Sequence, residues 1–110
     1  MKKSVKITNH QIISVLDIIG RLKAVDRVLP VKVSYVLNLN QNILLGLYKV
    51  YETTLKDLDK DSDQDKIIEL LNLENEVDLY VLDLDDILEA ELSIKEVEVI
   101  QTFMLTNEEE

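Results

Sequence analysis

The feature that most constrains the fold of this chain is an apolar stripe that runs from Leu29 to Leu58. Pro30 opens the stretch and suits the first turn of a helix, where a backbone N–H would have no partner. No proline follows, and apolar residues recur at intervals of three and four, the spacing of one helix face. We therefore predict a helix over about 30–58, roughly 43 Å long at 1.5 Å per residue.

The apolar face of this helix predicts either packing within one chain or the seam of a homodimer. Asn40 lies on the stripe, where a polar residue can fix register or oligomer state. We favour a partly solvated Asn40 beside a shorter helix, and we expect Leu44 and Leu47 to be buried. The candidate seam consists of Val33, Leu37, Asn40, Leu44, Leu47 and Tyr51.

Two capping boxes predict shorter helices near the two ends of the chain. Thr8 and Gln11 have the residue types and spacing of such a box, and they precede a helical apolar pattern over about 9–23. Ser93 and Glu96 repeat the motif ahead of the last helical pattern. We expect both helices to pack on the long one.

An acidic loop is predicted between the long helix and a third helix over about 63–73. Ser62 or Asp63 is the expected cap of that helix. Acids at every second position from Asp57 resemble a calcium loop, but Ser62 stands where the sharp turn needs Gly. Ile68 stands where a bidentate Glu belongs, so we interpret the run as a solvated turn without a metal site.

Two short segments alternate between polar and apolar residues, as strands do. These are residues 4–7 and the stretch from Glu76 to Leu82. Because a lone strand leaves its backbone unsatisfied, we expect the two to pair. The predicted class is α+β and mostly helical, with a minimal two-stranded antiparallel sheet, in one domain over 1–110 whose acidic tail, 106–110, is frayed.

Charge is unevenly distributed along the chain. Residues 1–56 hold nine Lys/Arg and three Asp/Glu, a balance of +6, whereas residues 57–110 hold three Lys and nineteen Asp/Glu, a balance of −16. Either the two halves face each other within the fold, or an acidic surface meets a basic partner. The candidate partner surface is Asp78, Asp83, Asp85, Asp86, Glu89 and Glu91.

The composition argues against several classes of function. A net charge of −10 opposes direct binding to nucleic acid or anionic membranes. No apolar run approaches the ~20 residues that span a bilayer, so we expect a cytoplasmic protein. The chain lacks cysteine and a glycine-rich phosphate loop, and His10 is its single histidine. We predict no enzyme, no cofactor and no metal.

Several stretches resemble small uncharacterised proteins encoded by phages and prophages of Gram-positive bacteria. The resemblance covers most of the chain, although other members have a longer charged insertion where this chain has only Asp57–Asp65. It is carried by Leu29-Pro30-Val31-Lys32-Val33-Ser34-Tyr35, Glu69-Leu70-Leu71, Glu74-Asn75-Glu76-Val77-Asp78-Leu79, Leu92-Ser93-Ile94-Lys95-Glu96 and Phe103-Met104. It implies a phage origin and the host bacterial cytoplasm as the setting, and it supplies no residue roles.

These observations predict a non-enzymatic binding protein. Its partner would be a host or phage protein, met through the acidic surface. One specific form is an inhibitor of a nucleic-acid-handling or defence system, whose basic groove the acidic surface would block. The alternative is a structural or assembly accessory that oligomerises through its long helix.

Overall fold

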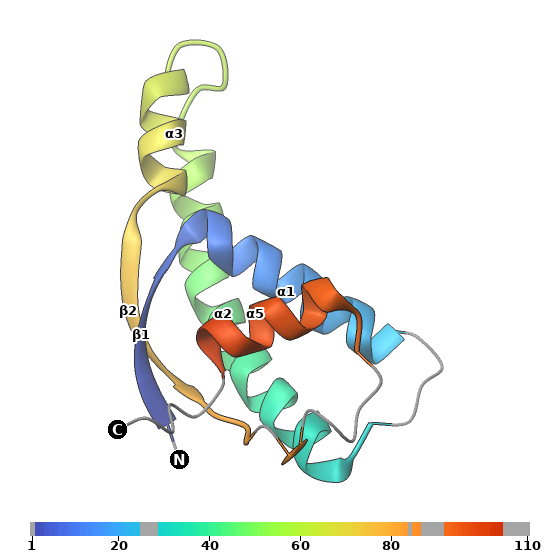
Figure 1. Cartoon of the computed structure of the whole chain (residues 1–110). Helices are drawn as coiled ribbons and strands as arrows, with labels where there is room; N and C mark the ends of the chain where they lie inside the picture. The colour runs from blue at the N-terminus through green and yellow to red at the C-terminus, as the bar shows by residue number, and fades with distance from the viewer. Residues whose placement is uncertain (1, 25–28, 84, 87–91, 105–110) are drawn as a thin grey trace.

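The computed structural model of the chain describes residues 2–24, 29–83, 85–86 and 92–104. These residues form a mostly helical α+β fold with one long helix and a two-stranded antiparallel sheet, which confirms the predicted class (Figure 1). The elements in order are β1 (Lys2–Thr8), α1 (Asn9–Ala24), α2 (Val31–Lys56), α3 (Gln64–Leu71), β2 (Glu74–Tyr80) and α5 (Ile94–Phe103).

The sheet joins the N-terminal strand to a strand more than seventy residues later, as predicted. β1 and β2 run antiparallel, with Lys2 opposite Tyr80 and Thr8 opposite Glu74. β2 begins two residues earlier than predicted and ends two residues earlier. Val5 and Ile7 of β1 are buried against the helices, whereas Ser4 and Lys6, which alternate with them, are exposed. The sheet therefore has one packed face and one solvent face.

The capping box at the start of α1 forms as predicted. The Gln11 N–H donates to Thr8 Oγ1 over 3.1 Å, and the Thr8 N–H donates to Gln11 Oε1 over 2.9 Å. These bonds satisfy backbone groups that a helix leaves open at its start. Ile12, Val15 and Ile19 then carry the buried face of α1 into the core.

The long helix α2 is buried over its first half only. Val33, Leu37 and Leu44 are almost inaccessible, whereas Val50, two turns further on, is 66% exposed. Figure 1 shows the reason, since α1 and α5 cross the first half of α2 while its second half projects past them towards α3. The C-terminal part of the predicted stripe therefore has few neighbours to pack against.

Asn40 corrects one prediction, because it is not partly solvated. Its side chain is fully buried and bonds to β2 rather than to water. Asn40 Oδ1 accepts from the Tyr80 N–H over 2.8 Å, and Nδ2 donates to the Tyr80 carbonyl over 3.0 Å. A buried carboxamide is stable here because both of its polar ends are satisfied.

Two further asparagines, Asn9 and Asn75, form hydrogen bonds at the other end of β2. The buried Asn9 side chain donates to the Leu70 carbonyl over 2.7 Å and accepts from Asn75 Nδ2 over 3.0 Å. Asn75 Nδ2 also donates to the Ile7 carbonyl over 3.1 Å. Side-chain amides therefore tie β2 to the rest of the fold near both of its ends.

Helix α3 folds back beside the end of α2, but its predicted cap is wrong in detail. Asp63 occupies the N-cap position without a side-chain cap bond. Its carboxylate accepts from the Asp59 N–H over 2.8 Å instead, which closes the preceding turn. The Asp63 carboxylate therefore stabilises the loop and does not cap the first turn of α3.

The last helix, α5, begins with the second predicted capping box. Ser93 Oγ accepts from the Glu96 N–H over 3.2 Å, and Glu96 Oε1 accepts from the Ser93 N–H over 2.8 Å. Beyond the helix, the Met104 carbonyl accepts from the Leu82 N–H over 2.6 Å. Both of these residues are fully buried, so the chain just after β2 is joined to the end of α5 within the core.

None of the helices in the described part of the chain is long and apolar enough to cross a membrane.

Candidate binding surface

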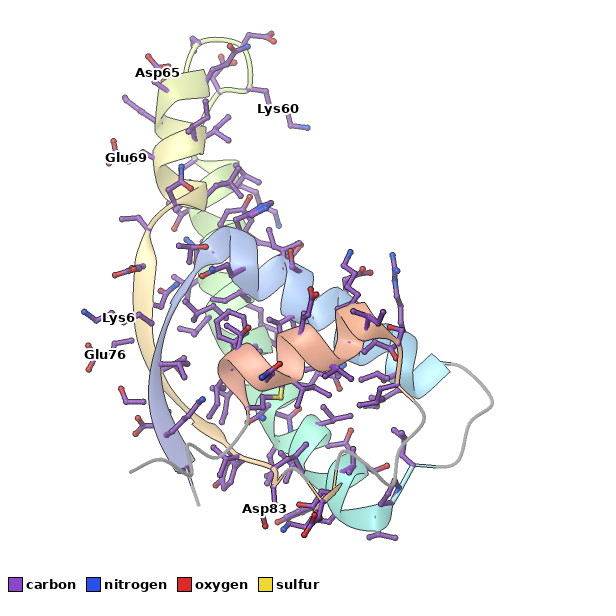
Figure 2. The ribbon with its side chains drawn as sticks, viewed as in Figure 1. Lys6, Lys60, Asp65, Glu69, Glu76 and Asp83 are labelled. Atoms are coloured by element: carbon purple, nitrogen blue, oxygen red, sulfur yellow. The ribbon has the colours of Figure 1, made fainter. Side chains whose placement is uncertain are left out.

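The structure brings Asp83, Asp85 and Asp86 of the predicted acidic residues into one turn and places Asp78 apart from them on β2. Asp78 is exposed on β2, and Asp83 and Asp85 are exposed in the turn after it, where Asp86 is half-buried. Glu89 and Glu91 lie outside the described residues. Figure 2 shows that Asp83 lies at one end of the molecule, far from Glu69 at the other, and that Glu76 lies between them.

Two of these acids pair with a lysine of the first half of the chain. Lys32 Nζ lies 3.0 Å from Asp86 Oδ2 and 3.6 Å from Asp83 Oδ2. The hydrogen bond from Lys32, helped by one from the Asp83 N–H, lowers the pKa of Asp86 below its usual value. Asp83 and Asp86 thus link the turn after β2 to the start of α2.

The solvent face of β2 carries three exposed carboxylates, those of Glu74, Glu76 and Asp78, which we call the acidic strip. On β1, Lys6 stands opposite Glu76 and Ser4 opposite Asp78. Figure 2 shows Lys6 and Glu76 on the side of the sheet that faces away from the helices. The strip was only partly predicted, because Asp78 alone belonged to the candidate partner surface.

The acidic loop before α3 uses its carboxylates to bind its own backbone. Asp59 Oδ1 accepts from the Asp61 N–H over 2.8 Å, and Asp63 accepts from the Asp59 N–H. Hydrogen bonds from the Asp61 and Ser62 amides lower the pKa of Asp59. Within the described ranges, no group of three or more His, Asp or Glu side chains is arranged to hold a metal ion.

A cavity lies beside the start of β2, where the strand meets α2 and α3. Its volume is about 260 Å³. Its walls are mainly apolar, with polar groups of β2 and α1 at one side. It is lined by Asn9, Leu47, Val50, Tyr51, Thr54, Leu70, Leu73, Glu74 and Asn75. No sequence pattern predicts this cavity, since its walls come from three separate parts of the chain.

The candidate seam on α2 is largely occupied by contacts within one chain. Val33, Leu37, Asn40 and Leu44 are buried inside the fold, and Leu47 packs half-buried against the core. Tyr51 is half-buried, with its ring centroid 5.8 Å from that of Tyr48. The homodimer stays a prediction, and the four buried side chains could join its seam only if the fold opened.

Comparison with protein-family models, curated proteins and solved structures found no match to this chain.

Proposed function

We propose that this chain is a non-enzymatic, phage-type protein that binds a host or phage protein through an acidic surface. The observation that carries the proposal is the exposure of the acidic strip on β2, with Asp85 exposed beyond it. Carboxylates held on a strand keep fixed spacing, so they can match a basic surface without reordering.

Charge supports a protein partner with a basic surface. The balance of −16 over residues 57–110 repels nucleic acid and attracts proteins that bind it. The specific form of the proposal is an inhibitor that covers the basic groove of a nucleic-acid-handling or defence protein in the bacterial cytoplasm. Its acidic side chains would there take the place of phosphates.

The test is charge reversal at exposed acids that are separate from the Lys32 pairing. Asp78→Lys with Asp85→Lys changes two exposed residues of different segments, and Glu98→Lys on α5 is a single charge-reversal control away from the strip. The tagged wild-type chain, the double variant and the control are used to capture proteins from host lysate at two salt concentrations.

We expect the wild type and Glu98→Lys to retain a basic protein that the double variant loses. Association should also slow as salt rises, because screening weakens long-range attraction. Circular dichroism must show equal helix content in all three proteins. Equal retention by the wild type and the double variant would contradict the proposal.

A further inference from the structure

The backbone of β2 shows which of its hydrogen-bonding groups point away from β1. In an antiparallel pair, successive residues direct their N–H and C=O groups alternately towards the partner strand and away from it. Both groups of Tyr80 bond to Asn40 of α2, so they point away from β1. At the other end, the Asn9 N–H donates to the Leu73 carbonyl over 3.1 Å and continues the same register.

Since the directions of the backbone groups are known at Tyr80 and at Leu73, the alternation gives the direction for every residue between them. Asn75, Val77 and Leu79 direct their backbone groups towards β1, and Glu74, Glu76 and Asp78 direct theirs outwards. The Asn40 side chain bonds to the outward backbone groups of Tyr80 and to no other residue of the described part of β2. Elsewhere in the described structure, no helix or loop backbone group bonds to Glu76 or Asp78. Among the residues that the structure describes, the outer edge of β2 is thus open over the length of the acidic strip.

We propose that this open edge of β2 is a docking site for an extended segment of the partner protein, added as a third strand. The segment carries Lys or Arg at alternate positions. This inference rests on the proposed function, because it assumes that the partner is a protein, and it adds where and how that partner binds. Strand addition takes its affinity from main-chain bonds and its specificity from alternate side chains.

The charge of the strip favours a basic segment. Every second side chain of β2 on the solvent face is Glu74, Glu76 or Asp78, so a third strand would place its own alternate residues beside carboxylates. β1 already shows a strand of this kind, with Lys6 opposite Glu76. Lys2 of the same strand lies over the Tyr80 ring, with Nζ 4.8 Å from the centroid.

The cavity beside the start of β2 could take apolar side chains of the same segment. The remaining side chains of a third strand would point to the helix side of the sheet. There, Leu47, Val50 and Tyr51 of α2 and Leu73 next to β2 supply apolar walls. The exposed side chains of Val50, at 66%, and Leu73, at 50%, would lose contact with water on binding.

A second copy of the chain fits this edge less well. Two β2 strands placed edge to edge would bring acidic strips together, and like charges in adjacent strands repel. The β1 edge of a second copy has lysines, but such head-to-tail pairing does not close and would produce open-ended assemblies. A separate basic segment meets neither difficulty.

The test uses a defined peptide rather than an unknown partner. An acetylated and amidated heptapeptide of alternating Lys and Val is titrated into the full chain and followed by amide NMR signals. The matched peptide has Glu in place of each Lys. Protein variants are Glu76→Lys with Asp78→Lys, the neutral pair Glu76→Gln with Asp78→Asn, and the control Glu98→Lys.

We expect the Lys peptide to bind and to slow hydrogen exchange at the Glu76 and Asp78 amides. The charge-reversed pair should bind about tenfold more weakly, since two cross-strand attractions become repulsions, and the neutral pair should lie between. Should the charge-reversed protein fail to fold, the neutral pair still decides the result. Glu98→Lys and the wild type should bind alike.

Four outcomes would overturn the inference. One is the absence of binding at millimolar peptide, and another is equal binding of the Lys and Glu peptides. The third is protection that falls away from β2, and the fourth is self-association of the free chain through this edge. If the peptide fails while Asp78→Lys with Asp85→Lys still abolishes capture from lysate, the edge is wrong and the proposed function stands. If capture also persists in that variant, both are wrong.

Discussion

The carboxamide of Asn40 takes the place of a neighbouring strand for one residue of β2. It satisfies the N–H and the C=O of Tyr80 together, and its own burial depends on those two bonds. The period of α2 places residue 40 on the buried stripe, so its burial could have been predicted. Its partner could not, because Tyr80 is forty residues away and nothing in the local sequence specifies that contact.

Replacing this amide should destabilise the fold. Asn40→Leu keeps the number and branching of the side-chain heavy atoms but leaves two backbone groups of Tyr80 without partners, at about 1–3 kcal/mol for each group that stays shielded from water. We expect a loss of about 2 kcal/mol or more in the free energy of unfolding, measured with urea. Asn38→Leu is the control, since Asn38 is exposed on the same helix and should change stability by less than ~0.5 kcal/mol. Equal stability of the two variants would show that Asn40 does not anchor β2.

At the scale of elements, the start of α2 is joined to the turn after β2 by charge. Lys32 bonds to Asp86 and Asp83, and the pKa of Lys32 is raised mainly by its hydrogen bond with Asp86. The pKa of Asp86 is lowered by the same contact. This pairing supports the interpretation that the basic first half of the chain faces part of the acidic second half.

The lowered pKa of Asp86 fixes the sign of a pH effect. A carboxyl whose pKa falls on folding stabilises the native state above its unfolded pKa of about 3.9. That contribution disappears as pH falls through the lowered pKa of the folded state. Lys32→Gln should therefore flatten the loss of stability below about pH 4, whereas Lys95→Gln on α5 should leave it unchanged. Denaturant curves at several acidic pH values check this, and parallel curves for wild type and Lys32→Gln would contradict it.

Elements with a strong local signal could be predicted, and those set by tertiary contacts could not. The starts of three helices could be predicted, because each depends on residues that are close together in the sequence. These are Pro30 before the apolar stripe of α2 and the capping boxes at Thr8 and Ser93. The cap of α3 was wrong because Asp63 bonds to Asp59 across a turn. The open edge of β2 also required the structure, since it depends on the register with β1 and on where α2 stops covering the strand.

Among the described residues, the two charge halves meet at the sheet and at Lys32, which pairs with Asp83 and Asp86. Lysines of β1 stand beside acids of β2, while the projecting end of α2 and α3 carries Asp65 and Glu69 away from the body (Figure 2). The pairing of Asp83 and Asp86 with Lys32 supports the first interpretation of the charge pattern. The acidic strip is exposed, and its contact with a basic partner stays a prediction.

The central claim is that the outer edge of β2 is open between the asparagine hydrogen bonds near its two ends. Amide hydrogen exchange of the full chain tests this claim most directly. Exchange is slow where an amide is bonded and fast where it meets water. The account predicts slow exchange at Val77, Leu79 and Tyr80, and exchange at Glu76 and Asp78 at least tenfold faster. Equal protection of all five amides in the free chain would contradict it, because the edge would then already be covered.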